Sequence, residues 1–121
     1  MDTPIIKIAI ADDEALFRAG MSFILTRVKN FEIIFEAENG TDLLEKLKTE
    51  VEKPDVILMD LKMPSLNGVE CTKILQKEYP EIKVIAVTSY DRKSFITNMI
   101  DVGASSYLLK NTSPKVVVHT I

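Results

Sequence analysis

The chain of 121 residues has the size and composition of a single globular domain, with 46% hydrophobic residues, 27% charged residues and a formal net charge of −3 at pH 7. This charge argues against nucleic-acid binding by this stretch alone, and a single cysteine, Cys71, excludes an internal disulfide and fits a reducing compartment. No apolar run approaches the roughly 18 residues of a membrane span and the N-terminus lacks signal-peptide features, so we expect a soluble cytoplasmic protein without a membrane partner.

Strand-like and helix-like segments alternate along the chain. The strand-like segments are short apolar runs with polar or turn residues at their ends, at residues 5–11, 32–37, 56–59, 82–88 and 107–109. The helix-like segments have apolar residues at three- and four-residue steps or a capping residue at their start. They cover residues 16–28, 69–78, about 92–102, and 114 onward. A further helix-like segment begins at residue 42 and ends in the polar run before Pro54.

Capping and turn residues mark several of these boundaries. Thr41 and Ser113 are expected to cap the second and the last helix, and Asn39-Gly40 is expected to end the second strand as a turn. The last helix begins at Pro114 and has room for only about two turns, in mostly apolar residues. We therefore expect that residues 1–121 are one domain of a longer protein, cut within its last helix.

Five strands that alternate with five helices indicate repeated βαβ units. The predicted fold is α/β, with a doubly wound five-stranded parallel sheet in the order 2-1-3-4-5 that is flanked by five helices. The third strand is four consecutive apolar residues, as expected for a central strand that is buried on both faces. Ligands of such sheets bind outside the carboxyl ends of the strands, which is where Asp60 follows the third strand.

Reactive side chains follow four of the five strands. They are Asp12, Asp13, Asp60, Thr88 and Lys110. Because these strand ends share one edge of the sheet, the side chains are expected to converge, and mutual repulsion is expected to raise the pKa values of the carboxyl groups unless a cation intervenes. Carboxylate oxygens suit Mg²⁺. With the metal and Lys110 holding a phosphoryl group, Asp60 could attack phosphorus.

Four motifs resemble those of the receiver domain of two-component response regulators. They are the pair Asp12-Asp13, the signature Asp60-x-x-x-Pro64-x-x-x-Gly68, the pair Thr88-Ser89, and Gly103-Ala104-x-x-Tyr107-Leu108-Leu109-Lys110. Within that family, Leu16-Phe17-Arg18-x-Gly20 and the Tyr-Leu-Leu-Lys ending resemble the NarL/LuxR-type branch, whose members carry a C-terminal helix-turn-helix. The resemblance spans essentially the whole chain and implies the CheY-like, flavodoxin-like form of the fold.

The resemblance implies a role for each matching residue. Asp60 would be the phosphoacceptor, Lys110 would pair with the phosphoryl oxygens, and Thr88 would report phosphorylation to Tyr107, an aromatic switch. Mg²⁺ would be held by Asp12, Asp13, Asp60 and the backbone carbonyl of Lys62. Lys62 and Tyr90 would flank the path of an attacking water. Many members carry a cis proline after the lysine, whereas Asn111 stands there in this chain, which leaves the geometry of that bond open.

The resemblance also implies partners. The phosphodonor would be a sensor histidine kinase, and the chain would be a signalling switch that aids its own phosphorylation without being a turnover enzyme. A homodimer could form through the fourth helix, the fifth strand and the last helix. We expect that this stretch does not bind DNA specifically, and that an absent C-terminal domain gives the full-length transcription regulator its DNA binding.

Structural interpretations and other functions remain as alternatives. Asp12 and Asp13 could cap a helix, Thr88 could be an ordinary β-branched strand residue and Tyr107 could pack in the core. Cys71 and His119 are interpreted as structural.

A flavin mononucleotide carrier shares the fold, but three acids after the first strand would repel a phosphate. A haloacid dehalogenase-type phosphatase needs a second aspartate where Lys62 stands. A degenerate receiver that is not phosphorylated would not need the complete residue set.

Overall fold

The computed structural model describes residues 4–89 and 93–121. Within these ranges strands and helices alternate without exception. The strands are β1 (Ile6–Ala11), β2 (Phe31–Ala37), β3 (Val56–Met59), β4 (Lys83–Thr88) and β5 (Ser106–Leu109). The helices are α1 (Ala15–Thr26), α2 (Gly40–Thr49), α3 (Gly68–Glu78), α4 (Lys93–Asp101) and α5 (Pro114–Thr120). The predicted segments agree with these elements to within a few residues.

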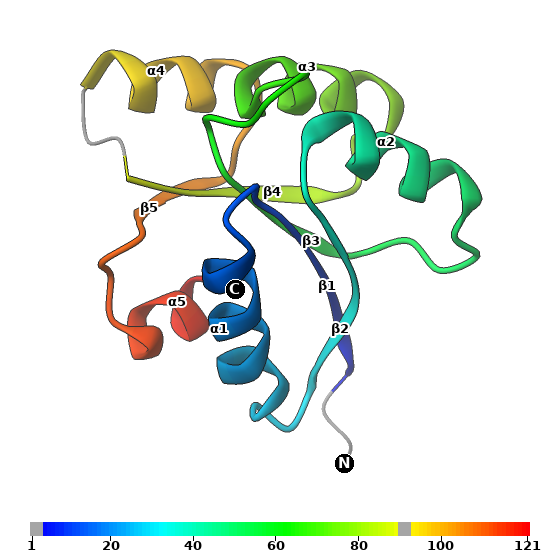
Figure 1. Cartoon of the computed structure of the whole chain (residues 1–121), viewed down its shortest axis with the longest axis vertical. Helices are drawn as coiled ribbons and strands as arrows, with labels where there is room; N and C mark the ends of the chain where they lie inside the picture. The colour runs from blue at the N-terminus through cyan, green and yellow to red at the C-terminus, as the bar shows by residue number, and fades with distance from the viewer. Residues whose placement is uncertain (1–3, 90–92) are drawn as a thin grey trace.

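The strands form one parallel sheet in the order β2-β1-β3-β4-β5, which confirms the predicted topology. Helices α1 and α5 cover one face of the sheet, and α2, α3 and α4 cover the other (Figure 1). The order of the strands reverses direction next to β1, so the loops after β1 and β3 diverge to opposite faces. This divergence opens a crevice at the carboxyl edge of the sheet.

Two apolar clusters fill the space between the sheet and its helices. Alternate residues of the central strands point to opposite faces: Ile57 and Met59 pack with α2, α3 and α4, whereas Val56 and Leu58 pack with α1 and α5. All four residues of β3 are buried, as its uninterrupted apolar run predicts. The central strand is therefore held from both sides, which gives Asp60 a rigid support.

The start of α2 differs from the prediction. The N-cap is Asn39 rather than Thr41, because the Asn39 side chain accepts a hydrogen bond of 2.8 Å from the backbone N–H of Asp42. Asn39-Gly40 is therefore a helix start and not a turn. A side chain at Gly40 would place its Cβ 2.4 Å from the carbonyl oxygen of Leu66, so the close approach of α2 to the loop after β3 requires glycine.

The last helix packs on the α1 face of the sheet. Val117 is buried there and Val118 and Ile121 lie against the same cluster, whereas Val116 is about half exposed. Ser113 occupies the predicted N-cap position, but its side chain makes no capping hydrogen bond. Among the described residues, no helix combines the length and the apolar character needed to cross a membrane.

Candidate functional site

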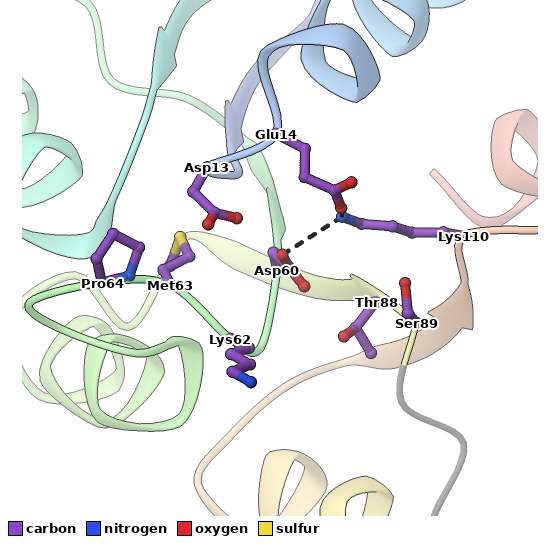
Figure 2. Close-up of a pocket in the computed structure, with 9 residues that line it drawn as sticks. All are labelled: Asp13, Glu14, Asp60, Lys62, Met63, Pro64, Thr88, Ser89 and Lys110. Atoms are coloured by element: carbon purple, nitrogen blue, oxygen red, sulfur yellow. Dashed lines mark hydrogen bonds and ion pairs between the residues drawn. The ribbon is translucent and has the colours of Figure 1, made fainter.

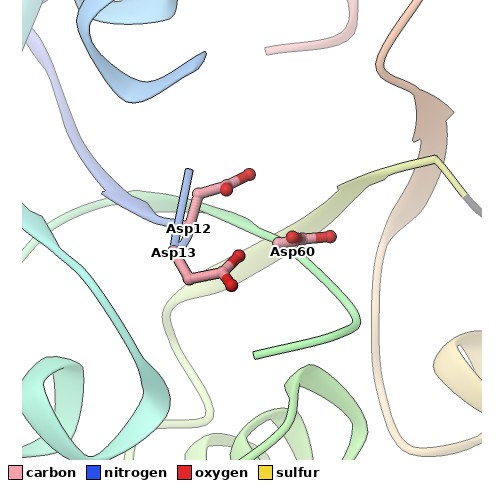
Figure 3. A group of neighbouring side chains, drawn as sticks. All are labelled: Asp12, Asp13 and Asp60. Atoms are coloured by element: carbon pink, nitrogen blue, oxygen red, sulfur yellow. The ribbon is translucent and has the colours of Figure 1, made fainter. Parts of the chain in front are cut away.

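Three carboxylates meet at the carboxyl edge of the sheet. Asp12 and Asp13 follow β1 and Asp60 follows β3, and the ends of the two strands are joined by a hydrogen bond of 2.9 Å from the Asp60 N–H to the carbonyl of Ala11, the last residue of β1. The three side chains lie beside one another (Figure 3), and each offers an oxygen within 4.8 Å of the others. Asp12 and Asp60 are buried and Asp13 is exposed, so the group opens to solvent on one side.

Lys110 reaches this group from β5. Its backbone N–H donates a hydrogen bond of 2.9 Å to the Thr88 carbonyl, which fixes the start of the side chain at the same edge. The Nζ atom lies 2.9 Å from Asp12 Oδ2. It also lies 3.4 Å from Asp60 Oδ2 and donates to Glu14 Oε1 (Figure 2). The chain itself therefore places one cation, the ammonium of Lys110, beside the acidic group.

The residues around Asp60 line an open pocket of about 490 Å³. It combines acids, cations, hydroxyl groups and an apolar wall, and Figure 2 shows Lys110 and Lys62 on different sides of Asp60. The lining residues are Asp13, Glu14, Asp60, Lys62, Met63, Pro64, Thr88, Ser89 and Lys110. A small anionic group can enter this pocket and meet a carboxylate, an ammonium and a hydroxyl at once.

Lys110 remains fully charged in this setting. Burial by itself would lower its pKa, but the hydrogen bonds with Glu14 and Asp12 and the charges of Asp60 and Asp12 outweigh burial and raise the pKa well above the ordinary lysine value. The ammonium also lies 4.6 Å from the centre of the Phe17 ring. Because the folded-state pKa is raised, the lysine contributes its full stabilisation at neutral pH and loses it only under strongly alkaline conditions.

The carboxyl groups of Asp12 and Asp60 have raised pKa values, as predicted, but mutual repulsion is not the main cause. Burial contributes most to both shifts; for Asp12 the charge of Asp60 adds a smaller rise, and Lys110 opposes the rise at both groups. At Asp60 a hydrogen bond from the Thr88 side chain also opposes it. Asp12 is further held by the N–H of Glu14, at 2.8 Å from Oδ1.

These raised pKa values predict a pH-dependent effect of Asp60→Asn on stability. Because the pKa of Asp60 is higher in the folded state than in the unfolded state, protonation of this carboxyl group favours the fold. The stabilisation is complete below the ordinary pKa of 3.8 and is lost as the pH rises through the folded-state pKa. The variant should therefore be more stable than the metal-free wild type at neutral pH, by about 1 kcal/mol. Urea unfolding without divalent cations measures the difference in stability between the two proteins, and this difference should disappear in acid. Equal stability of the variant and wild type at neutral pH would contradict the prediction.

The chain beyond Asp60 is folded tightly under the carboxylate. A Cβ atom at Gly68, the first residue of α3, would lie 2.2 Å from the Asp60 carbonyl oxygen and 2.8 Å from the Leu61 Cα atom. The Gly68 N–H donates a hydrogen bond of 2.7 Å to the Leu61 carbonyl. The glycine eight residues after Asp60 therefore lets the start of α3 pack against the main chain that carries the reactive side chain.

Of the residues predicted to form the switch and the water path, Tyr107 lies away from the pocket lining and Tyr90 lies outside the described residues. Tyr107 is on β5, in register with Ala86, and packs partly buried against the cluster beneath α2, α3 and α4. Thr88 is two positions after Ala86 and so lies on the same face of the sheet. Tyr90 was predicted to flank the path of an attacking water, and this prediction lies outside the described residues. The bond between Lys110 and Asn111 is trans, since no cis bond occurs in the described ranges.

The structure also brings in two residues that sequence reasoning did not assign to the site. Glu14 contacts Lys110 through its carboxylate, and Phe17 lies against the same ammonium. The acidic run Asp12-Asp13-Glu14 was a signal for Glu14, although it was also compatible with a helix start. Nothing in the sequence alone links Phe17 to a lysine that is 93 positions later.

Comparisons with known proteins identify the family of the chain. The profile described as the response regulator receiver domain matches residues 8–121. The chain is 40% identical over 116 residues to the transcriptional regulatory protein DegU of Brevibacillus brevis, across 96% of this chain and 48% of that protein. It is 34% identical over 116 residues to the response regulator GacA of Pseudomonas syringae, across 96% of this chain and 53% of that protein. The chain thus spans about half the length of the curated relatives it matches.

A solved structure is similar over the same range. It is a DNA-binding response regulator of the LuxR family from Staphylococcus aureus, which superposes with a TM-score of 0.88 at 28% sequence identity. The alignment covers 96% of this chain and 95% of the solved chain. The similarity therefore includes the sheet and the helices that position the acidic group.

Proposed function

Because the chain belongs to the response regulator receiver family, in its NarL/LuxR-type branch, we propose that it is a phosphorylation switch that accepts a phosphoryl group on Asp60. The observation that carries the proposal is the position of Asp60: its carboxylate lies in an open pocket, 3.4 Å from the ammonium of Lys110 and beside a pair of further acids. Such a site places a nucleophile next to groups that neutralise charge.

The donor set also fits Mg²⁺. Three carboxylates offer hard oxygen atoms within 4.8 Å of one another, and their open side leaves room for waters and a substrate oxygen. Asp12, Asp13, Asp60 and the backbone carbonyl of Lys62 would hold the ion. When bound, Mg²⁺ neutralises negative charge on the oxygens of the phosphoryl group during transfer.

In the proposed reaction, one oxygen of the Asp60 carboxylate forms a bond to phosphorus while the bond from phosphorus to the donor breaks. The leaving group takes that electron pair, and Asp60 becomes an acyl phosphate. Lys110 pairs with a phosphoryl oxygen from the side opposite Lys62, because its Nζ atom already lies 3.4 Å from Asp60 Oδ2. The protein contributes mainly position and charge, which is the larger part of catalysis for phosphoryl transfer.

Incubation with a small phosphodonor such as acetyl phosphate tests the proposal. With Mg²⁺ present, the intact mass of the chain should increase by one phosphoryl group, and with an excess of chelator the increase should be at least about tenfold slower, since charge neutralisation is worth several kcal/mol. No mass increase under either condition would refute the proposed function. Increases at equal rates would refute the metal requirement alone.

We propose that Thr88 couples phosphorylation of Asp60 to a change in the position of Tyr107. The Thr88 side chain is buried and donates to Asp60, so a charged phosphoryl group at Asp60 would give its hydroxyl a stronger acceptor. Movement of Thr88 toward that group would open space on the face of the sheet where Tyr107 packs. The surface formed by α4, β5 and α5 would then differ between the two states.

Thr88→Ala should separate phosphorylation from this response. The variant keeps Asp60 and Lys110, so it should still gain a phosphoryl group, within about tenfold of the wild-type rate. It should lose most of the phosphorylation-dependent change in self-association or partner binding, measured by sedimentation with and without phosphodonor. If wild type self-associates on phosphorylation and the variant does so equally, the proposed coupling through Thr88 is wrong.

The relatives suggest the partners. We propose that the phosphodonor is a sensor histidine kinase in the cytoplasm, and that the chain acts as a switch rather than as a turnover enzyme. Its relatives are named transcriptional regulators and are about twice as long as this chain, so we propose that the receiver controls a DNA-binding domain in a longer protein. Dimerisation through α4, β5 and α5 belongs to the same proposal.

A further inference from the structure

The ammonium of Lys110 contacts more carboxylates than phosphoryl transfer requires. Its Nζ atom contacts the carboxylates of Asp12, Asp60 and Glu14. An ammonium has three hydrogens, and three carboxylates surround this one. A phosphoryl oxygen that approaches Lys110 therefore competes with these carboxylates for the hydrogens of the ammonium.

The three carboxylates differ in how easily they can leave. The side chains of Asp12 and Asp60 are 2% and 7% exposed, whereas that of Glu14 is 60% exposed. Asp12 and Asp60 also belong to the acidic group that can hold a metal ion, which does not include Glu14. Glu14 is attached through its backbone, since its N–H donates to Asp12 Oδ1, but its carboxylate can rotate into water at little cost.

We propose that Glu14 is a positioning residue that holds Lys110 before phosphorylation and yields its place on the ammonium to an oxygen of the phosphoryl group. This inference rests on the proposed function and adds a regulatory role for a residue outside the reacting set. Glu14 lines the same pocket as Asp60, so its negative charge also opposes the entry of an anion. The wild-type chain would consequently bind a phosphoryl group less tightly than the pocket without Glu14 would allow.

If Glu14 only supported Lys110, loss of its charge would weaken anion binding and not strengthen it. If Glu14 only kept Lys110 in place, its loss would let the ammonium move away from Asp60 and would weaken anion binding. In the proposed role, Asp12 and Asp60 keep Lys110 in position after Glu14 is neutralised, because both already lie within 3.4 Å of Nζ in the wild-type chain. The sign of the change in affinity therefore distinguishes an exchangeable partner from a support.

The experiment measures the binding of beryllofluoride, an anion that mimics a phosphoryl group on a carboxylate, by calorimetry at saturating Mg²⁺. Glu14→Gln should bind about 2- to 5-fold more tightly than wild type, the range expected from a solvent-exposed ion pair. Glu45→Gln is the matched control, because it removes the same charge from an exposed position on α2, and it should bind as wild type does.

A second readout follows Glu14 itself. In wild type, the ¹³C resonance of the Glu14 carboxylate should move toward that of a solvated glutamate when beryllofluoride binds, because the contact with Lys110 is given up. Equal or weaker binding by Glu14→Gln, or a Glu14 resonance that does not move, would overturn the inference. Absence of beryllofluoride binding by wild type would instead overturn the proposed function, and this inference with it.

Discussion

Asp60→Asn is expected to abolish phosphoryl uptake. The intact mass of the variant should not increase under conditions that phosphorylate wild type. The rate of phosphoryl uptake should fall by at least about 10³-fold, as expected when a nucleophile is removed from a preorganised site. The physical reason is that an amide has no charged oxygen to attack phosphorus, while the other groups of the pocket cannot replace it. Asp12 is buried against Lys110 and Asp13 lies on the exposed side of the acidic group.

A matched control separates this effect from a general loss of structure. Asp101→Asn makes the same chemical change at an exposed position at the end of α4, and it should phosphorylate at the wild-type rate. Because Asp60→Asn should also be the more stable protein at neutral pH without metal, its loss of activity cannot result from unfolding. Phosphate uptake by Asp60→Asn at the wild-type rate would show that another residue is the acceptor.

Lys110→Met is expected to have the largest effect on stability. Methionine keeps most of the apolar stem but removes the ammonium, which leaves the buried carboxylates of Asp12 and Asp60 without their cation. Removing one partner of a buried ion pair in this way lowers the free energy of unfolding by about 3 kcal/mol. This value is at the low end of the range for buried ion pairs, because the pocket is open to solvent. The free energy of unfolding should fall by this amount at neutral pH without divalent cations, and phosphoryl uptake should fall as well.

The loss of stability in Lys110→Met should depend on pH. Without the cation, the pKa values of Asp12 and Asp60 in the folded state rise further, so the variant regains stability as these groups become protonated in acid. Lys73→Met is the control, since Lys73 is exposed on α3, and it should be within about 0.5 kcal/mol of wild type. A pH-independent loss in Lys110→Met would mean that packing against Phe17, rather than charge, is the main contribution.

The sequence by itself determined the fold and the chemistry of the site. Short apolar runs that alternate with helix-like segments allow few arrangements other than parallel βαβ units, and a fully apolar third strand is typical of a central position. Once the strands are parallel, residues that follow them must meet at one edge. This is why Asp12, Asp60 and Lys110 could be placed together although 98 positions separate the first from the last. The receiver family predicted from the same residues is confirmed by the match over residues 8–121.

Only the tertiary structure decided what depends on distance and burial. Strand order brings the acids together but does not say that burial, more than repulsion, raises the pKa values of Asp12 and Asp60. Nor does it say which carboxylates share the ammonium of Lys110, because side-chain rotation decides between partners a few ångströms apart. The choice of Asn39 over Thr41 as a helix cap has the same origin: both residues have capping side chains, and the close packing of Gly40 against Leu66 sets where α2 begins.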